Sequence, residues 1–140
     1  MRYWDSSALV SLLVQEPETA KREKQLRADA EIVTWWATRV ECASALNRLA
    51  RGGRLTQAQL KLALGDLDEL AEGWAEVQPS DRVRLRAQRL LRVHPLRAAD
   101  ALQLSACLVA FDGESPGATF VCADERLGEA AEKEGLRVLP

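Results

Sequence analysis

Short apolar runs alternate along the chain with longer segments in which apolar residues recur every three or four positions. The longer segments have the helical period, as at Val40, Ala43, Leu46 and Leu49. The run at 31–35 is β-branched and apolar, which favours a strand. We expect strands at 2–4, 31–35, 74–78, 118–122 and 136–139. We expect helices at 6–14, 18–29, 38–51, 56–72, 80–93, 97–111 and 124–134.

Local signals mark the ends of several predicted helices. Gly52-Gly53 ends the helix at 38–51, and Gly135 ends the last one. Thr56 and Gln59 have the spacing of a capping box, which opens the next helix. Strands separated by helices need crossover connections and therefore pair in parallel. We predict one α/β domain over 1–140, a three-layer α/β/α sandwich with a small central parallel sheet.

Composition adds little to this prediction. The chain has 140 residues, of which 47% are hydrophobic and 29% charged, an ordinary globular balance. No signal peptide is visible, and no apolar run reaches the roughly 18 residues of a membrane span, so we expect a cytoplasmic protein. Cys42, Cys107 and Cys122 lack zinc-knuckle spacing. We expect them to be small buried residues in a reducing compartment.

The net charge of -2 argues against a general nucleic-acid binder, which is usually basic. The positive charge is concentrated, however, because six arginines fall in one short stretch: Arg82, Arg84, Arg86, Arg89, Arg92 and Arg97. Three of them, Arg82, Arg86 and Arg89, share a helical face. This face could contact a phosphate backbone, or it could be a solvated or salt-bridged surface.

Four acidic residues stand where predicted strands end or the following helices begin. Asp5 follows the first strand, and Asp124 follows the strand at 118–122. Glu41 and Asp100 lie in the first turns of the helices at 38–51 and 97–111. Sites of parallel sheets form at the carboxyl ends of the strands. We therefore expect all four side chains to point towards one edge.

Each acid also has a structural interpretation. Asp5, Asp100 and Asp124 could cap helices, and Glu41 could be a solvated helical residue. Against this interpretation, each of three acids lies next to apolar residues: Asp5 follows Tyr3-Trp4, Glu41 stands between Val40 and Cys42, and Asp100 is set in 98–102. Carboxylates are rare in such surroundings unless they are paired or bound to metal.

A cluster of carboxylates suits a hard cation that relieves their repulsion. Mg²⁺ prefers oxygen ligands and keeps several waters, and Mn²⁺ accepts the same ligands. One or two such ions can activate water and stabilise the charge on a phosphodiester. His94 is the single histidine, so one chain cannot use two histidines as acid and base. It precedes Pro95 in a helix break, and we expect a structural or solvent-facing role.

Four segments around these acids resemble the motifs of PIN-domain nucleases: YWDSSALV at 3–10, VECASAL at 40–46, LRAADALQL at 96–104 and FVCADERL at 120–127. The third is the most specific, and the resemblance covers nearly the whole chain. Length and motif order are most similar to the VapC toxins of bacterial and archaeal toxin–antitoxin pairs. The resemblance implies endonucleolytic cleavage of RNA, a VapB-like antitoxin that blocks the toxin, and homodimers.

The same resemblance implies roles for individual residues. Mg²⁺ or Mn²⁺ would be bound, and catalysis carried, by Asp5, Glu41, Asp100 and Asp124. Ser7 would add a hydroxyl near Asp5, unless that hydroxyl only bonds helix backbone. The fourth acidic position varies in such proteins, so Glu125 is an alternative to Asp124. We choose Asp124 because it follows the strand.

The motifs of two other enzyme classes are missing from the chain. Phosphatases that form an aspartyl-phosphate carry Asp-x-Asp, whereas Ser7 stands two positions after Asp5. No P-loop motif occurs. The alternative that stays open is a PIN-like module that binds RNA or a partner without catalysis. The presence of all four acids argues for the enzyme.

Two sets of apolar residues on the chain have two interpretations each. Trp35, Trp36 and Trp74 could lie in the core or mark an interface. Leu60, Leu64 and Leu67 could form a groove for an antitoxin helix, or a buried core stripe. Core packing is the more common outcome for both sets.

Overall fold

The computed structural model describes residues 1–112 and 117–140. Within these residues, five strands form one parallel sheet in the order β3-β2-β1-β4-β5. The strands are β1 (Arg2–Trp4), β2 (Ile32–Trp35), β3 (Ala75–Val77), β4 (Thr119–Val121) and β5 (Arg137–Leu139). The predicted parallel sheet is therefore confirmed.

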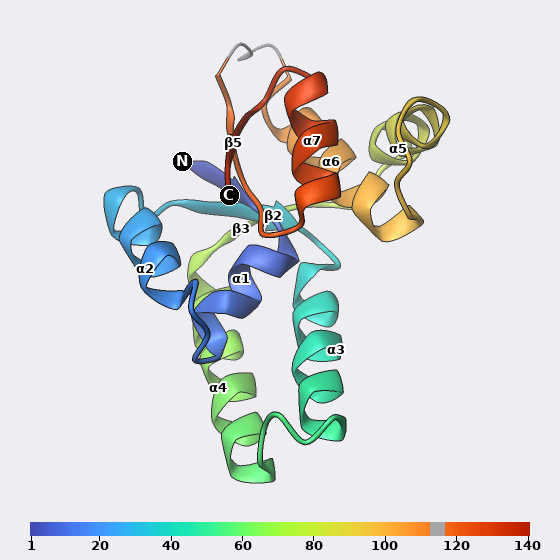
Figure 1. Cartoon of the computed structure of the whole chain (residues 1–140). Helices are drawn as coiled ribbons and strands as arrows, with labels where there is room; N and C mark the ends of the chain where they lie inside the picture. Colours follow the sequence, from blue (N-terminus) through green and yellow to red (C-terminus); the bar gives the residue numbers. More distant parts are fainter. Residues whose placement is uncertain (113–116) are drawn as a thin grey trace.

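Helices cover both faces of the sheet, as Figure 1 shows. The helices are α1 (Ser6–Leu13), α2 (Thr19–Ala28), α3 (Thr38–Arg51), α4 (Gln57–Gly73), α5 (Asp81–Val93), α6 (Ala98–Ala110) and α7 (Glu125–Lys133). On one face lie α5, α6 and α7, and on the other lie α1 to α4. This is the predicted three-layer sandwich.

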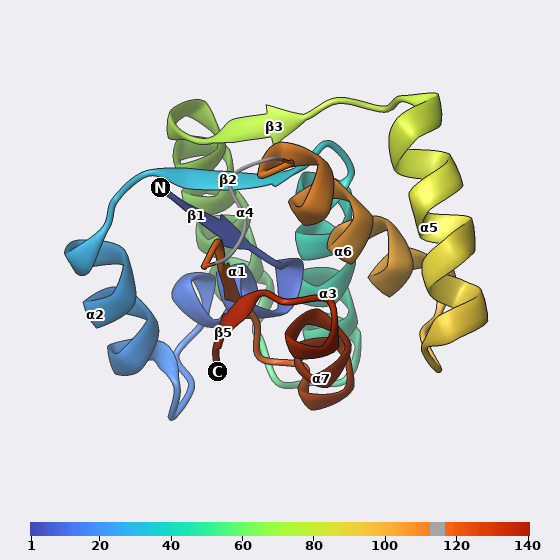
Figure 2. The same cartoon turned by 90° about the horizontal axis from the view of Figure 1, so that it is seen from above.

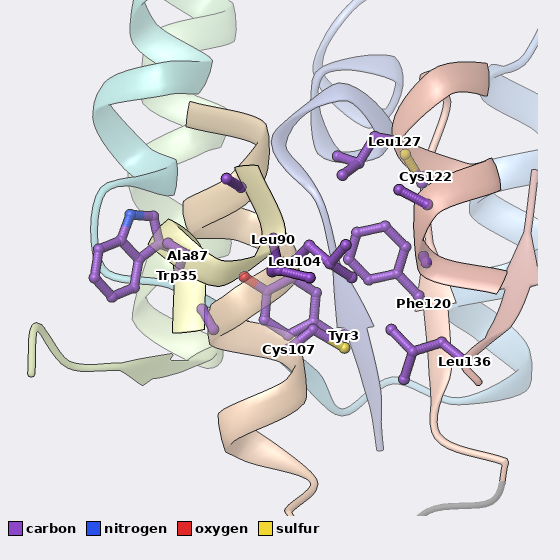
Figure 3. Packing of buried hydrophobic residues seen from close by; sticks show 14 of the residues in the cluster. Tyr3, Trp35, Ala87, Leu90, Leu104, Cys107, Phe120, Cys122, Leu127 and Leu136 are labelled. Carbon is purple, nitrogen blue, oxygen red and sulfur yellow. The ribbon is translucent and has the colours of Figure 1, made fainter. Parts of the chain in front are cut away.

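The two cores follow from the alternation of side chains along each strand. In β1, Tyr3 points into the core under α5, α6 and α7, and Trp4 points into the core under α1, α3 and α4. Both are fully buried. Figure 3 shows the first core, where the rings of Tyr3 and Phe120 stack with centroids 5.4 Å apart. Packing on both faces thus holds β1 in place, and with it Asp5, the residue that follows the strand.

The predicted helix boundaries agree closely with the structure. Helix α3 has the predicted bounds, and Gly53 (φ 75°) and Gly135 (φ 89°) adopt the left-handed conformation after α3 and α7. The capping box of Thr56 and Gln59 is present at the start of α4. One placement is wrong. Strand β4 ends at Val121, so Asp124 does not directly follow it.

Most of the tryptophans and leucines that could lie either in the core or at an interface are core residues. Trp35 and Trp74 are buried, as are Leu60 and Leu67 of the apolar stripe on α4. Trp36 is the exception, with 53% of its surface exposed. The three predicted buried cysteines are buried and free: Cys42, Cys107 and Cys122. In the part of the chain that the structure describes, no helix is both long and apolar enough to span a membrane.

The connections create a switch point between β1 and β4. From β1 the chain crosses to β2 on one side, whereas β4 pairs with β1 on the other. The Asp5 N–H donates to Val121 O (2.9 Å), which joins the carboxyl ends of β1 and β4. In parallel α/β sheets, ligands bind at such a point. Figure 2 shows α1, α3, α6 and α7 gathered around this end of the sheet.

Candidate active site

A pocket of about 1300 Å³ opens at the carboxyl edge of the sheet. Residues of α1, α3, α6 and α7 line it, and they include four of the candidate acids: Glu41, Asp100, Asp124 and Glu125. Asp5 is only 3% exposed and lies next to the lining residues Ser6 and Ser7. The structure therefore brings every predicted acid to one edge.

Asp5 is the buried member of this group and also the N-cap of α1. Its Oδ2 accepts hydrogen bonds from the N–H of Ser7 (2.9 Å) and from the Ser7 hydroxyl. Burial raises the pKa of Asp5, the hydrogen bonds from Ser7 oppose that effect, and the charge of Asp100 adds to it. Within residues 1–112 and 117–140, no hydrogen bond engages Oδ1. Asp5 thus combines its capping role through Oδ2 with a second carboxylate oxygen, Oδ1, that accepts no hydrogen bond from these residues.

Glu41 lies in the first turn of α3, and its Oε2 accepts two hydrogen bonds. The Ser6 hydroxyl donates at 2.9 Å and the Gln103 amide at 3.1 Å. Burial raises the pKa of Glu41, these two hydrogen bonds oppose it, and the charges of Asp5 and Asp100 raise it further. Glu41 is therefore a held, partly buried carboxylate, and the solvated helical residue was the wrong alternative.

Asp100 completes a group of three interacting charges. It lies in the first turn of α6, where the Arg97 N–H approaches its Oδ2 at 3.4 Å. Its charge contributes to the raised pKa of both Asp5 and Glu41. Like charges held this close are unfavourable unless a cation or a proton neutralises them.

Asp124 and Glu125 lie at the start of α7. Asp124 caps this helix, since its Oδ1 accepts from the Leu127 N–H at 2.8 Å. Both carboxylates are exposed and line the pocket. The choice between them as the fourth acid therefore stays a prediction.

The residues at this edge fit a hydrated divalent cation better than a fully protein-coordinated one. Among the described residues, no three acidic, histidine or cysteine side chains lie close enough to hold a metal ion by themselves. Mg²⁺ commonly binds through one or two carboxylates and keeps several waters. Asp5 and Glu41 each have one hydrogen-bonded oxygen and one oxygen without a hydrogen bond from the described residues. That arrangement suits such an ion.

Two buried polar side chains near the site were missed from the sequence. Gln103 is 1% exposed and bonds Glu41, and Arg22 is 1% exposed and donates to the Cys122 carbonyl at 3.3 Å. Gln103 stands three positions after Asp100, so helical spacing could have placed both on one side of α6. No signal distinguished Arg22 from the other charges of its helix.

The predicted arginine face is a salt-bridged surface. Arg82 and Arg86 pair with Asp112, and Arg89 pairs with Glu134 at 3.0 Å. His94 is buried against the same Glu134, with 2.7 Å between Nε2 and Oε1, so its structural role is confirmed.

Different arginines line the pocket: Arg48 from α3, Arg97 at the start of α6 and Arg126 from α7. All three are exposed. Over residues 1–112 and 117–140, the ion pairs found involve other cations. The acidic pocket therefore has a rim of arginines with no carboxylate partner among these residues.

Comparisons with known proteins agree with this geometry. A family model described as PIN domain matches residues 2–133. Ribonuclease VapC45 of Mycobacterium tuberculosis (strain CDC 1551 / Oshkosh) is 31% identical over 141 residues, which cover 99% of this chain and 94% of the relative. Ribonuclease VapC49 of Mycobacterium tuberculosis (strain ATCC 25618 / H37Rv) matches with the same identity and coverage.

Proposed function

The chain belongs to the PIN-domain family, and we propose that it is a metal-dependent endoribonuclease of the VapC type, the toxin of a toxin–antitoxin pair. The observation that carries this proposal is the group of three interacting carboxylates, one of them buried, at the edge of a large open pocket. A structural group of acids would be neutralised by basic partners, whereas Asp5 and Glu41 are held by hydroxyl and amide donors.

The positions of the acids support the following proposed roles. Asp5, Glu41, Asp100 and Asp124 would hold Mg²⁺ or Mn²⁺, one or two of them directly and the others through metal-bound water. The ion would supply an activated water and stabilise the charge on the phosphodiester. Ser7 orients Asp5 through its backbone N–H and its hydroxyl. Asp124 contributes the oxygen that does not cap α7. None of these steps needs the buried His94.

RNA would be bound by the arginine rim of the pocket. Arg48, Arg97 and Arg126 come from three different elements around the acids, so a strand that crosses the pocket would meet a cation on each wall. A phosphate backbone needs such cations to offset the repulsion from the carboxylates. This rim replaces the salt-bridged arginines of α5 as the proposed RNA contact.

A partner and a second copy complete the proposed biology. A VapB-like antitoxin would bind the chain and block the pocket, and the active form would be a homodimer.

The described strands, from β1 at residue 2 to β5 at residue 139, form one sheet, which supports a single domain over 1–140.

RNA cleavage by the purified chain in Mg²⁺, in Mn²⁺ and in EDTA tests the proposal, with Asp100→Asn prepared in parallel. We expect cleavage that requires metal and falls by at least about 100-fold in the variant, because one metal-bound charge is lost while side-chain volume is nearly conserved. Cleavage that persists in EDTA or in Asp100→Asn would contradict the carboxylate mechanism. Carboxylate-independent RNA binding without cleavage would favour the non-catalytic module.

Expression of the chain in bacteria tests the toxin assignment. We expect the wild-type chain to slow growth and Asp5→Asn to leave growth normal at equal soluble expression. Equal growth of the two cultures would count against a toxin and would leave the ribonuclease chemistry to the cleavage experiment.

A further inference from the structure

Gln103 links the elements that carry three of the acids. It lies on α6, three positions after Asp100, and is 1% exposed. Its Oε1 accepts a hydrogen bond from the Tyr3 hydroxyl at 2.8 Å. Its Nε2 donates to Thr38 Oγ1 at 3.0 Å and to Glu41 Oε2 at 3.1 Å. One buried amide therefore joins β1 and the first turn of α3 to α6.

Glu41 determines which way the Gln103 amide faces. A carboxylate oxygen accepts hydrogen bonds, so the NH₂ of Gln103 must point to Glu41, and a reversed amide would place two acceptors against each other. The carbonyl Oε1 of Gln103 then faces the Tyr3 hydroxyl, which donates to it at 2.8 Å. The contact with Tyr3 therefore helps to hold the amide in this orientation.

We propose that Gln103 is a positioning residue for Glu41: its amide holds one carboxylate oxygen and leaves the other free to bind a hydrated divalent cation. The inference rests on the proposed metal-dependent function. Without this donor, the Glu41 side chain would keep only the Ser6 hydroxyl as a partner among the described residues. Groups that orient metal ligands typically contribute about 10–100-fold to metal affinity.

The chain offers a matched control on the same helix. Ser105 is fully buried on α6, and its hydroxyl donates to Val83 O at 2.7 Å, away from the acids. Ser105→Ala therefore removes a buried hydrogen bond from α6 without touching a carboxylate. Gln103→Met removes the amide while it keeps length and much of the volume. The two variants separate loss of positioning from loss of stability.

The experiment is a Mn²⁺ titration of the full chain, with free Mn²⁺ measured by electron paramagnetic resonance. We expect Gln103→Met to weaken Mn²⁺ binding by at least about 10-fold. Ser105→Ala should stay within about twofold, because its lost bond does not reach an acid. Thermal melts in EDTA check that every variant is folded. Tyr3→Phe, which keeps the ring in the core, should weaken binding more than twofold but less than Gln103→Met.

The outcomes distinguish this inference from the proposed function. Wild-type affinity in both Gln103→Met and Tyr3→Phe would overturn the positioning role and leave the metal site intact. An equal loss in Ser105→Ala would also overturn it, because the effect would then be one of general stability. If Gln103→Met does not fold, wild-type affinity in Tyr3→Phe alone would overturn it. A wild-type chain that binds no Mn²⁺ would contradict the proposed function and this inference with it.

Discussion

Asp5 shows at the scale of one residue how function opposes stability. Its carboxylate is buried beside two other acids, and the pKa is raised chiefly by burial from an ordinary value of 3.8. An ionised group with a raised pKa weakens the folded state in the absence of a cation. The fold tolerates this because Asp5 also caps α1 through Ser7.

Asp5→Asn should therefore stabilise the metal-free protein while it abolishes cleavage. An asparagine oxygen can still accept from Ser7, and the buried charge is removed. We expect the free energy of unfolding at pH 7 in EDTA to rise by about 0.5–2 kcal/mol. Denaturant unfolding measures this change. A variant less stable than the wild type in EDTA would contradict our account of Asp5.

The burial of Asp5 and Glu41 sets the sign of the pH dependence of stability. The folded protein holds protons on Asp5 and Glu41 more tightly than the unfolded chain does, because both pKa values are raised by burial. In EDTA, stability should fall as pH rises from the ordinary values of 3.8 and 4.5 through the raised ones. Saturating Mn²⁺ should remove this loss at neutral pH. A metal-free protein whose stability rises through that window would contradict the prediction.

The sequence revealed the acids but not the groups that hold them. Carboxylates among apolar neighbours are visible in a sequence, so Asp5, Glu41 and Asp100 could be selected. Arg22 carries no such mark, and although Gln103 stands between two leucines, its bonds to Tyr3 and Glu41 depend on how the helices dock on the sheet. Long-range contacts of this kind have no local pattern.

At the scale of elements, α2 is fixed to the sheet by an arginine. Arg22 is 1% exposed and donates to the carbonyl oxygens of Cys122 at 3.3 Å and Leu139 at 3.4 Å. We expect Arg22→Ala to lower the free energy of unfolding by about 1–3 kcal/mol, because buried acceptors lose their donor. Arg27→Ala, at an exposed position of the same helix, should change it by less than about 0.5 kcal/mol. Similar effects in both would mean that Arg22 is not an anchor.

The start of α7 combines a cap with a candidate metal ligand. Asp124→Asn keeps an oxygen for the Leu127 N–H, so we expect lost cleavage with little change in stability. Asp124→Ala should also lose about 1 kcal/mol of stability with the cap. Glu125→Gln should leave cleavage near the wild-type rate. Cleavage assays and thermal melts of the three variants decide whether Asp124 or Glu125 is the fourth metal-binding acid. Loss of cleavage in Glu125→Gln alone would assign that role to Glu125.

Elements with strong local signals could be predicted almost to the residue, whereas both ends of β3 and β4 were placed one residue too far out. Helix α3 has both a clear apolar period and a glycine stop, and its bounds were predicted. Strand β4 was predicted to run to Cys122 because the apolar run does, but its pairing with β1 ends at Val121. Apolar character continues past the last pairing because Cys122 is buried at the site.

For the whole molecule, the net charge of -2 conceals a separation of charge. The acids lie at the carboxyl edge of the sheet, and Arg48, Arg97 and Arg126 surround them from three elements. Among the described residues, four of the five arginines on α5 form ion pairs, with Asp81, Asp112 or Glu134. The fold therefore decides which arginines can contact a bound RNA, and the clustering of arginines along the sequence does not.

The salt dependence of RNA binding follows from this distribution. Each cation that contacts a phosphate of single-stranded RNA contributes about 0.7 to the slope of log K against log salt concentration. We expect Arg48→Ala, Arg97→Ala and Arg126→Ala each to reduce the slope by about that amount, measured in EDTA to prevent cleavage.

The matched control for these variants is Arg84→Ala. Arg84 is exposed on α5, where it pairs with Asp81 at 2.9 Å, and it does not line the pocket. The slope should be unchanged in this variant, because the removed cation is outside the proposed path of the strand. If the slope of log K against log salt concentration falls in Arg84→Ala but not in the pocket variants, RNA binds on α5 instead. The carboxylates would then lie away from the bound RNA.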